Sequence, residues 1–270
     1  MKWFKTHKFL LLRRITQLSI LGLFMLGPWF GLWIIKGNLT ASLILDTLPL
    51  TDPYVLLQSL VAGHIPEIIG LVGAGIIILF YLLVGGRVYC SWVCPINIVT
   101  DAAAYLRTKL AIKTRTKFSR SLRYWILGMT IIVSWLTATI AWELVNPVSM
   151  LYRGLVFGMG LAYAMVIAIF LFDLLISQRG WCSHLCPVGA FYSLLSKFSW
   201  LKIDASKRKQ CDDCMDCFNI CPEPQVIKPA LKQFENQSLI LSPNCTNCGR
   251  CIDICEKDVF NFSIRSHVGK

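Results

Sequence analysis

Eight cysteines in the C-terminal third of the chain form two runs with the same spacing. The runs are Cys211-x-x-Cys214-x-x-Cys217-x-x-x-Cys221-Pro222 and Cys245-x-x-Cys248-x-x-Cys251-x-x-x-Cys255. This spacing is typical of a domain with two [4Fe–4S] clusters, in which three cysteines of a run ligate one cluster and the fourth ligates the other. The pattern therefore predicts a small α+β, ferredoxin-like domain over residues 201–270.

The same spacing predicts which cysteines share a cluster. Cys211, Cys214, Cys217 and Cys255 are expected to hold the first cluster, and Cys245, Cys248, Cys251 and Cys221 the second. Zinc sites also use C-x-x-C pairs, but zinc would need its four ligands in two pairs, whereas each run supplies three close thiols and a fourth. A disulfide framework is disfavoured because the domain is expected to face the reducing cytoplasm.

The rest of the chain is too apolar for a soluble domain. Hydrophobic residues make up 55% and charged residues 16%, against about 25% charged in soluble domains. Four stretches reach the roughly 20 residues that a membrane crossing needs: Ile15 to Ile35, Ile65 to Val84, Tyr124 to Trp142 and Leu155 to Ile176. The prediction is an α-helical membrane protein with a basic segment at 1–14 and a four-span domain at 15–200.

The net charge of +12 follows the predicted membrane spans, so it does not indicate nucleic acid. All but two of the 27 Lys and Arg residues lie before the first span, between the second and third, or after the fourth; the exceptions are Lys36 and Arg153. Because positively charged loops stay inside, both termini are expected in the cytoplasm. The predicted location is a multi-pass protein of the bacterial inner membrane.

The remaining four cysteines lie in a duplicated motif, R-x-x-C-S-x-x-C-P, which contains Cys90 and Cys94 in one copy and Cys182 and Cys186 in the other. Each copy follows a span that returns to the cytoplasm, so the membrane domain is predicted to be two in–out–in hairpins of the same orientation. Since the residue before proline avoids the helical region, Cys94 and Cys186 are expected to end a helix.

Three interpretations of these four thiols stay open. They could form a third metal or Fe–S site, take part in thiol redox chemistry or a quinone pocket, or only shape the ends of the spans as small buried hydrophobes. All four are therefore candidate catalytic residues.

Acidic residues inside spans are costly, so they are often functional. Asp173, near the inner end of the fourth span, is a candidate acceptor for a quinol proton, with an ion pair to Arg87 or Arg179 as the structural alternative. Two pairs near the outer face are candidates for an outward quinol site: Glu143 with Asn146, and His64 with Glu67.

The combination of two R-x-x-C-S-x-x-C-P turns, four spans and crossed cysteine runs resembles the NapH family of ferredoxin-type membrane subunits. Three stretches add to the resemblance: Gly27-Pro28-Trp29-Phe30-Gly31, Asp46 to Pro53, and Trp142-Glu143 with Asn146-Pro147-Val148-Ser149. The resemblance covers the whole chain.

The resemblance implies an electron-transfer subunit of a quinol dehydrogenase. It would oxidise membrane quinol and pass electrons to a periplasmic ferredoxin-type subunit, and through that partner to periplasmic nitrate reductase. The alternative is an accessory membrane ferredoxin that supplies electrons for assembly or maintenance of a respiratory metalloenzyme. No nucleotide fingerprint or nucleophile triad indicates another enzymatic activity.

Overall fold

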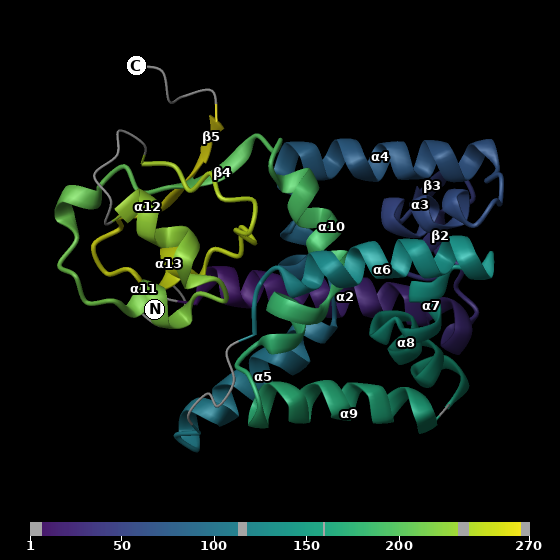
Figure 1. Ribbon diagram of the computed structural model, residues 1–270, viewed down its shortest axis with the longest axis horizontal. Helices are drawn as coiled ribbons and strands as arrows, with labels where there is room; N and C mark the ends of the chain where they lie inside the picture. The colour runs from purple at the N-terminus through teal and green to yellow at the C-terminus, as the bar shows by residue number, and fades with distance from the viewer. Residues whose placement is uncertain (1–6, 113–117, 159, 232–237, 266–270) are drawn as a thin grey trace. The chain divides into compact units, whose positions relative to one another are not determined.

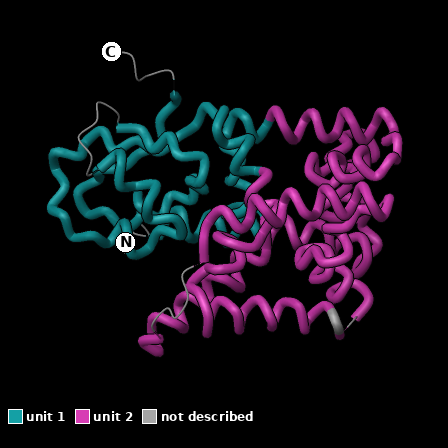
Figure 2. Tube along the Cα trace, viewed as in Figure 1, with its two compact units in different colours: residues 1–17, 80–93, 192–270 teal, residues 18–79, 94–191 magenta. Residues whose placement is uncertain are grey.

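The computed structural model describes residues 7–112, 118–158, 160–231 and 238–265. The chain divides into two compact units (Figure 2). Unit 1 comprises residues 1–17, 80–93 and 192–270, and unit 2 comprises residues 18–79 and 94–191. The cysteine-rich C-terminal part therefore shares a unit with two segments that are distant in sequence.

The first half of unit 2 combines helices with a small sheet (Figure 1). Helix α2 (Lys8–Phe30) leads into a three-stranded antiparallel sheet of β1 (Ile35–Gly37), β2 (Ala41–Ile44) and β3 (Leu48–Thr51), which pair in sequence order. The short helix α3 (Pro53–Val61) and the apolar helix α4 (Ile68–Val84) follow. Gly73 lets β3 approach α4, since a Cβ at that position would lie 3.1 Å from the backbone of Pro49.

The second half of unit 2 is all helical. It contains α6 (Leu122–Thr137), α7 (Ala141–Val145), α8 (Pro147–Phe157) and α9 (Gly160–Leu175). Helix α5 (Ile96–Lys109) and helix α8 both pack on α9, and Val148 of α8 meets Ile96 and Ile169 in a small buried core.

The two halves of the chain repeat the same order of elements, and this repeat extends well beyond the nine-residue motif R-x-x-C-S-x-x-C-P. In each, a long helix is followed, after the sheet β1–β3 in the first half and after α7 in the second, by a short helix that begins at Asx-Pro. An apolar helix, a five-residue π-helix and a helix that begins at or just after proline then complete the order. The Asx side chain caps the short helix in both cases, because Asp52 accepts from the N–H of Tyr54 (2.9 Å) and Asn146 from that of Val148 (3.1 Å). Asx residues are among the strongest N-caps.

Each predicted span overlaps a helix, but the ends differ from the prediction, and the crossing of a membrane by four spans stays a prediction. Among the described residues, α2 is long and apolar enough to cross a membrane, and three shorter apolar helices lie at 68–84, 122–137 and 162–175. The first predicted span was placed too late, because α2 begins at Lys8 and ends at Phe30. The third predicted span ends too late, because α6 ends at Thr137 and Ala138 adopts a left-handed conformation (φ 50°). The fourth prediction was wrong at its start, because Gly158 adopts a left-handed conformation (φ 68°) that ends α8.

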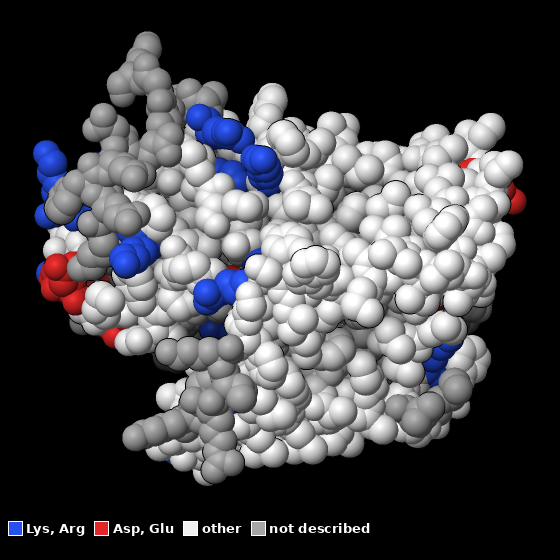
Figure 3. Space-filling model, viewed as in Figure 1, with Lys and Arg blue, Asp and Glu red and all other residues white. Residues whose placement is uncertain are grey.

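The surfaces of the units differ in charge. On the face in Figure 3, blue and red side chains gather over unit 1, whereas uncharged side chains cover most of unit 2. Large apolar side chains of α4 and α6 are exposed in unit 2, among them Ile68, Val72, Trp125 and Ile132. Extended exposed apolar surface of this kind marks contact with a membrane or another protein.

Unit 1 contains little regular structure. Strands β4 (Leu201–Asp204) and β5 (Asn261–Ile264) form a two-stranded antiparallel sheet. The short helices are η3 (Arg208–Gln210), α11 (Asp216–Ile220), η4 (Pro224–Val226), α12 (Ile227–Leu231) and α13 (Arg250–Ile254). Cys217, Cys245 and Cys251 belong to the buried core of this unit. A sheet of two strands is marginally stable by itself, so this fold depends on its cysteine sites.

Candidate iron–sulfur site

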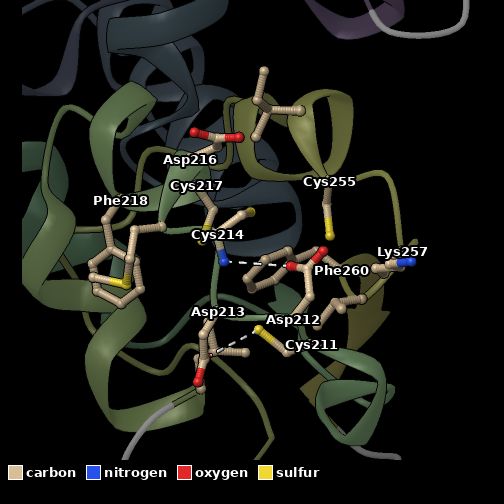
Figure 4. Close-up of a pocket in the computed structure, with 14 residues that line it drawn as sticks. Cys211, Asp212, Asp213, Cys214, Asp216, Cys217, Phe218, Cys255, Lys257 and Phe260 are labelled. Carbon is tan, nitrogen blue, oxygen red and sulfur yellow. Dashed lines mark hydrogen bonds between the residues drawn. The ribbon is translucent and has the colours of Figure 1, made fainter.

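The first cavity of unit 1 is lined by the four cysteines predicted to hold one cluster. Cys211, Cys214 and Cys217 come from the segment around the start of α11, and Cys255 follows α13. Their sulfur atoms surround a common space in Figure 4. Cys214 is exposed and Cys217 is buried, so one side of this first cage, as we call it, faces solvent.

Carboxylates border the first cage. Asp212, Asp213 and Asp216 line the cavity, together with one cation, Lys257. The Cys214 N–H donates to Asp212 Oδ1 (3.4 Å), and the Cys211 thiol lies 3.6 Å from Asp213 Oδ1 (Figure 4). Burial, followed by repulsion from Cys211, raises the pKa of Cys217 to about 11. The apo cage therefore favours thiols, and ligation by iron would have to displace their protons.

The second cavity is lined by the other four cysteines, Cys221, Cys245, Cys248 and Cys251. Three of them are fully buried, and Cys221 is half-buried. Cys221 follows α11 in the first run, so each cavity draws its fourth thiol from the other run. The predicted crossed grouping is thus present in space, while ligation itself stays a prediction.

Buried cations surround this second cage. Arg13, Arg87, Lys202 and Arg250 are each at most 5% exposed. Arg87 forms an ion pair with Glu223 (3.1 Å) and also donates to the carbonyl of Asn244 (2.7 Å). Lys202 donates to the carbonyl of Ser196 (2.7 Å).

These cations favour the charged thiolate forms of Cys245 and Cys248. Burial raises the pKa of Cys245 to about 11, although Lys202 and Arg87 oppose this rise. At Cys248, burial also disfavours the thiolate, but Arg250 and Arg13 outweigh it and the pKa is lowered. Burial in turn lowers the pKa of Lys202 to about 8, with Cys245 opposing the shift.

The first R-x-x-C-S turn contacts the second cage directly. The π-helix η1 (Tyr89–Val93) contains Cys90 and belongs to unit 1. Ser91 Oγ donates to the carbonyl of Thr246 (2.8 Å), and Trp92 Nε1 donates to that of Asn247 (3.1 Å). With Arg87 bound to Asn244, this turn holds the loop that carries Cys245 and Cys248.

The second turn lies in unit 2 and has other partners. The π-helix η2 (Trp181–Leu185) contains Cys182, whose thiol lies 4.0 Å from the Thr100 hydroxyl. Cys186 ends the helical turn in an extended conformation, and Cys94 is likewise outside η1, which confirms the effect predicted for the residue before proline. Cys90 belongs to unit 1, and the other three cysteines of the duplicated motif belong to unit 2. A site shared by all four stays a prediction.

Asp173 is fully buried near the end of α9. Its Oδ1 accepts from the N–H of Trp181 (2.9 Å), so the carboxylate caps the start of η2, and Oδ2 has no hydrogen-bond partner among the described residues. Of the two expected ion-pair partners, Arg87 pairs with Glu223 and Arg179 with Asp101 (3.3 Å), while Arg179 and Arg107 also interact electrostatically with Asp173.

The residues predicted near the outer face have structural contacts. Asn146 caps α8 and donates to Glu143 (3.1 Å), and His64 Nε2 contacts the carbonyl of Ala138 (3.1 Å). Among the described residues, no hydrogen bond or ion pair joins His64 or Glu67 to Glu143 or Asn146.

The residues that line the two cavities fit [4Fe–4S] clusters, because each cavity is lined by four cysteines, three from one run and one from the other. Cys211, Cys214, Cys217 and Cys255 would hold one cube, and Cys221, Cys245, Cys248 and Cys251 the other.

Comparison with known proteins agrees with this geometry. A family described as a 4Fe-4S binding domain matches residues 67–113 and again 159–208, and a family described as a 4Fe-4S dicluster domain matches residues 202–256. The ferredoxin-type protein NapH of Haemophilus influenzae is 50% identical over 99% of this chain and 94% of its own length. The chain belongs to the NapH family of ferredoxin-type proteins.

Other relatives extend the family. NapH of Escherichia coli is 45% identical over 97% of the chain and 92% of its own length. The methylamine utilization ferredoxin-type protein MauN of Methylorubrum extorquens is 51% identical over 97% of the chain and 91% of its own length. No solved structure matches the chain. An iron–sulfur, electron-transfer role therefore follows for this member of the NapH family.

The residues around the second cage were not predicted from the sequence. Arg13, Arg87, Lys202 and Arg250 are expected from the sequence mainly as positive charges that set membrane orientation, yet the structure buries all four. One signal was available: Arg87 and Arg179 occupy the same position of the duplicated motif, which is unusual for residues that only solvate a membrane surface.

Proposed function

We propose that this chain is the electron-transfer membrane subunit of a quinol dehydrogenase. It would oxidise membrane quinol and pass electrons through two [4Fe–4S] clusters toward a periplasmic ferredoxin-type partner and, through it, nitrate reductase. The observation that carries the proposal lies within unit 1, where Arg87, Ser91 and Trp92 bond to the loop of residues 244–247. A turn that follows a predicted span thus contacts a cage directly.

The cages supply one-electron chemistry when their clusters are bound, and the chain's own residues do the rest. The eight cysteines from Cys211 to Cys255 would hold the clusters. The η1 turn fixes the loop of the second cage, and the exposed Cys214 leaves the first cage open to solvent. Because the cages are expected in the cytoplasm and the partner is periplasmic, electrons would have to cross the membrane, and the thiols of Cys90, Cys94, Cys182 and Cys186 are the candidate relay.

The membrane arrangement is part of the proposal. We expect four spans with both termini in the cytoplasm, because the basic residues flank the helices on one side. Alkaline phosphatase fused within residues 45–47 should be active, whereas fusion within residues 113–117 should give no activity. Activity at both positions, or only at the second, would contradict this topology.

The functional test is anaerobic purification in detergent, followed by iron analysis and EPR before and after addition of a quinol. We expect about eight iron atoms per chain from two clusters and cluster reduction by quinol. Replacing Cys90, Cys94, Cys182 and Cys186 together by serine separates the roles of those thiols. A lower iron content assigns them a third metal site, and unchanged iron with lost quinol reduction assigns them to redox chemistry or the quinone pocket.

The accessory role is the second candidate. The MauN relatives, which are named for methylamine utilization, are as similar to this chain as the NapH relatives, so similarity alone does not favour steady electron supply to nitrate reductase over this role. Rapid depletion of the protein from cells that already hold assembled nitrate reductase distinguishes the two. Nitrate reduction that stops at once supports direct electron transfer, and nitrate reduction that persists supports the accessory role.

A further inference from the structure

The two cages have opposite electrostatic surroundings although their cysteine spacing is the same. We propose that the second cage takes up the first electron and that the first cage is reduced only afterwards, at lower potential. The proposal rests on the proposed function, because it requires a cluster in each cage. Each step is the addition of one electron from an external reductant, with no bond formed or broken.

Positive charge is concentrated at the second cage. Arg250 lines the cavity, Arg87 pairs with the lining residue Glu223, and the buried Lys202 precedes the lining residue Ile203. Among the described residues that line this cavity, the one carboxylate is Glu223, and it is paired with Arg87. A reduced cluster carries one more negative charge than an oxidised one, so nearby cations favour reduction.

Negative charge is concentrated at the first cage. Asp212, Asp213 and Asp216 line the cavity, against a single Lys257. The same carboxylates would oppose the extra negative charge of a reduced cluster.

Burial of the second cage opposes its reduction, so this effect has to be compared with the attraction to the nearby cations. A dry surrounding penalises the more negative reduced cluster, and the second cage is the more buried of the two. The low dielectric of the same surrounding also strengthens attraction to Lys202 and Arg250. Arg250 lines the cavity itself and is only 5% exposed, so water screens its charge little. At the exposed first cage, water screens the carboxylates but does not reverse their sign.

The consequence is an ordered pair of sites. The second cage, which the η1 turn holds, would act as the electron store, and the first cage, with Cys214 exposed, would be the site open to external redox partners. The first cage would hold an electron only once the second cage is already reduced.

The test is an EPR-monitored redox titration of the anaerobically purified full-length protein, using dithionite and mediators in place of quinol. Two one-electron waves are expected in the wild type. Lys202→Met and Arg250→Gln should each lower the upper wave by an amount equal to at least a tenfold change in electron partition, about 59 mV for one electron. The Asp212→Asn, Asp216→Asn double variant should raise the lower wave.

Two controls keep the result interpretable. Lys202→Arg retains the charge and should leave both waves in place, and Lys228→Gln removes an exposed cation from the same unit and should also have no effect. If Arg250→Gln loses iron, the shifts measured for Lys202→Met and for the Asp212→Asn, Asp216→Asn double variant still test the order of reduction. Coincident waves in the wild type, or a lower wave that responds to Lys202→Met, would overturn the ordering. An iron content too low for two clusters would instead refute the proposed function.

Discussion

At the residue scale, the buried charges of unit 1 are the feature that sets this chain apart. Arg87 and Glu223 are 2% and 1% exposed, and their side chains come from segments more than a hundred residues apart. A buried pair of this kind contributes little over an apolar replacement, but loss of one partner leaves an uncompensated charge. The pair therefore fixes how η1 joins the second cage.

Breaking this pair should destabilise unit 1. Arg87→Met or Glu223→Gln alone should each cost about 3–5 kcal/mol, while the double variant should recover part of that loss. Thermal unfolding of the purified protein, followed through cluster absorbance, measures the effect. If the losses of the two single variants simply add in the double variant, the two side chains do not act as a pair.

At the element scale, Gly86 packs closely against the backbone of a neighbouring helix. Gly86 precedes the first R-x-x-C-S turn, and a Cβ there would collide with the carbonyl of Tyr192 and lie 2.7 Å from the N–H of Ser196, both in α10 (Pro187–Ser196). Both contacts are with backbone, which cannot move aside as a side chain can.

Gly86→Ala should therefore destabilise the protein by about 1–3 kcal/mol, as overpacking does. Gly75→Ala, inside α4, is the matched control, since no atom lies within 4 Å of a Cβ at that position. Denaturant titration in detergent should show a loss only for the Gly86 variant. Equal midpoints for the two variants would contradict the close packing of Gly86 on α10.

Substitution of Asp173 tests whether this acid, near the end of the fourth predicted span, has a structural role. Asp173→Asn keeps an oxygen for the Trp181 N–H and should preserve folding, iron content and quinol-driven reduction, whereas Asp173→Ala should lose about 1–3 kcal/mol of stability. Asp101→Asn, which removes the partner of Arg179, is the control for loss of an acid nearby. Quinol reduction that fails in Asp173→Asn with intact iron would assign it the proton-accepting role.

At the scale of the whole molecule, the patterned parts were predictable and the contacts across the chain were not. The spacing of Cys211 to Cys255 predicts two groups of thiols, and Pro95 and Pro187 predict where the turns end. The start of α9 was missed because Gly158 breaks a continuous apolar run, and hydropathy does not report a left-handed residue. The burial of Arg13 and Lys202 depends on partners far along the chain, which local patterns do not contain.

Iron removal should act on unit 1 as a whole. Its core contains Cys217, Cys245 and Cys251, and its sheet has only two strands, so loss of the clusters removes much of what holds residues 201–265 together. Chelation under oxidising conditions should expose this region to trypsin, with cleavage after Lys207, Arg208 or Lys209 followed by mass spectrometry. The holo protein is the control, and equal cleavage of the two forms would contradict this dependence.

The crossed cavities also constrain how the protein is made. Cys255 completes a cavity otherwise lined by residues of the first run and its surroundings, and Cys221 completes one whose other thiols lie in the second run. A ribosome that has translated only the first run has therefore produced neither full set of four thiols. The apolar helices are translated before either set of thiols is complete, so we expect membrane insertion of these helices not to depend on iron supply.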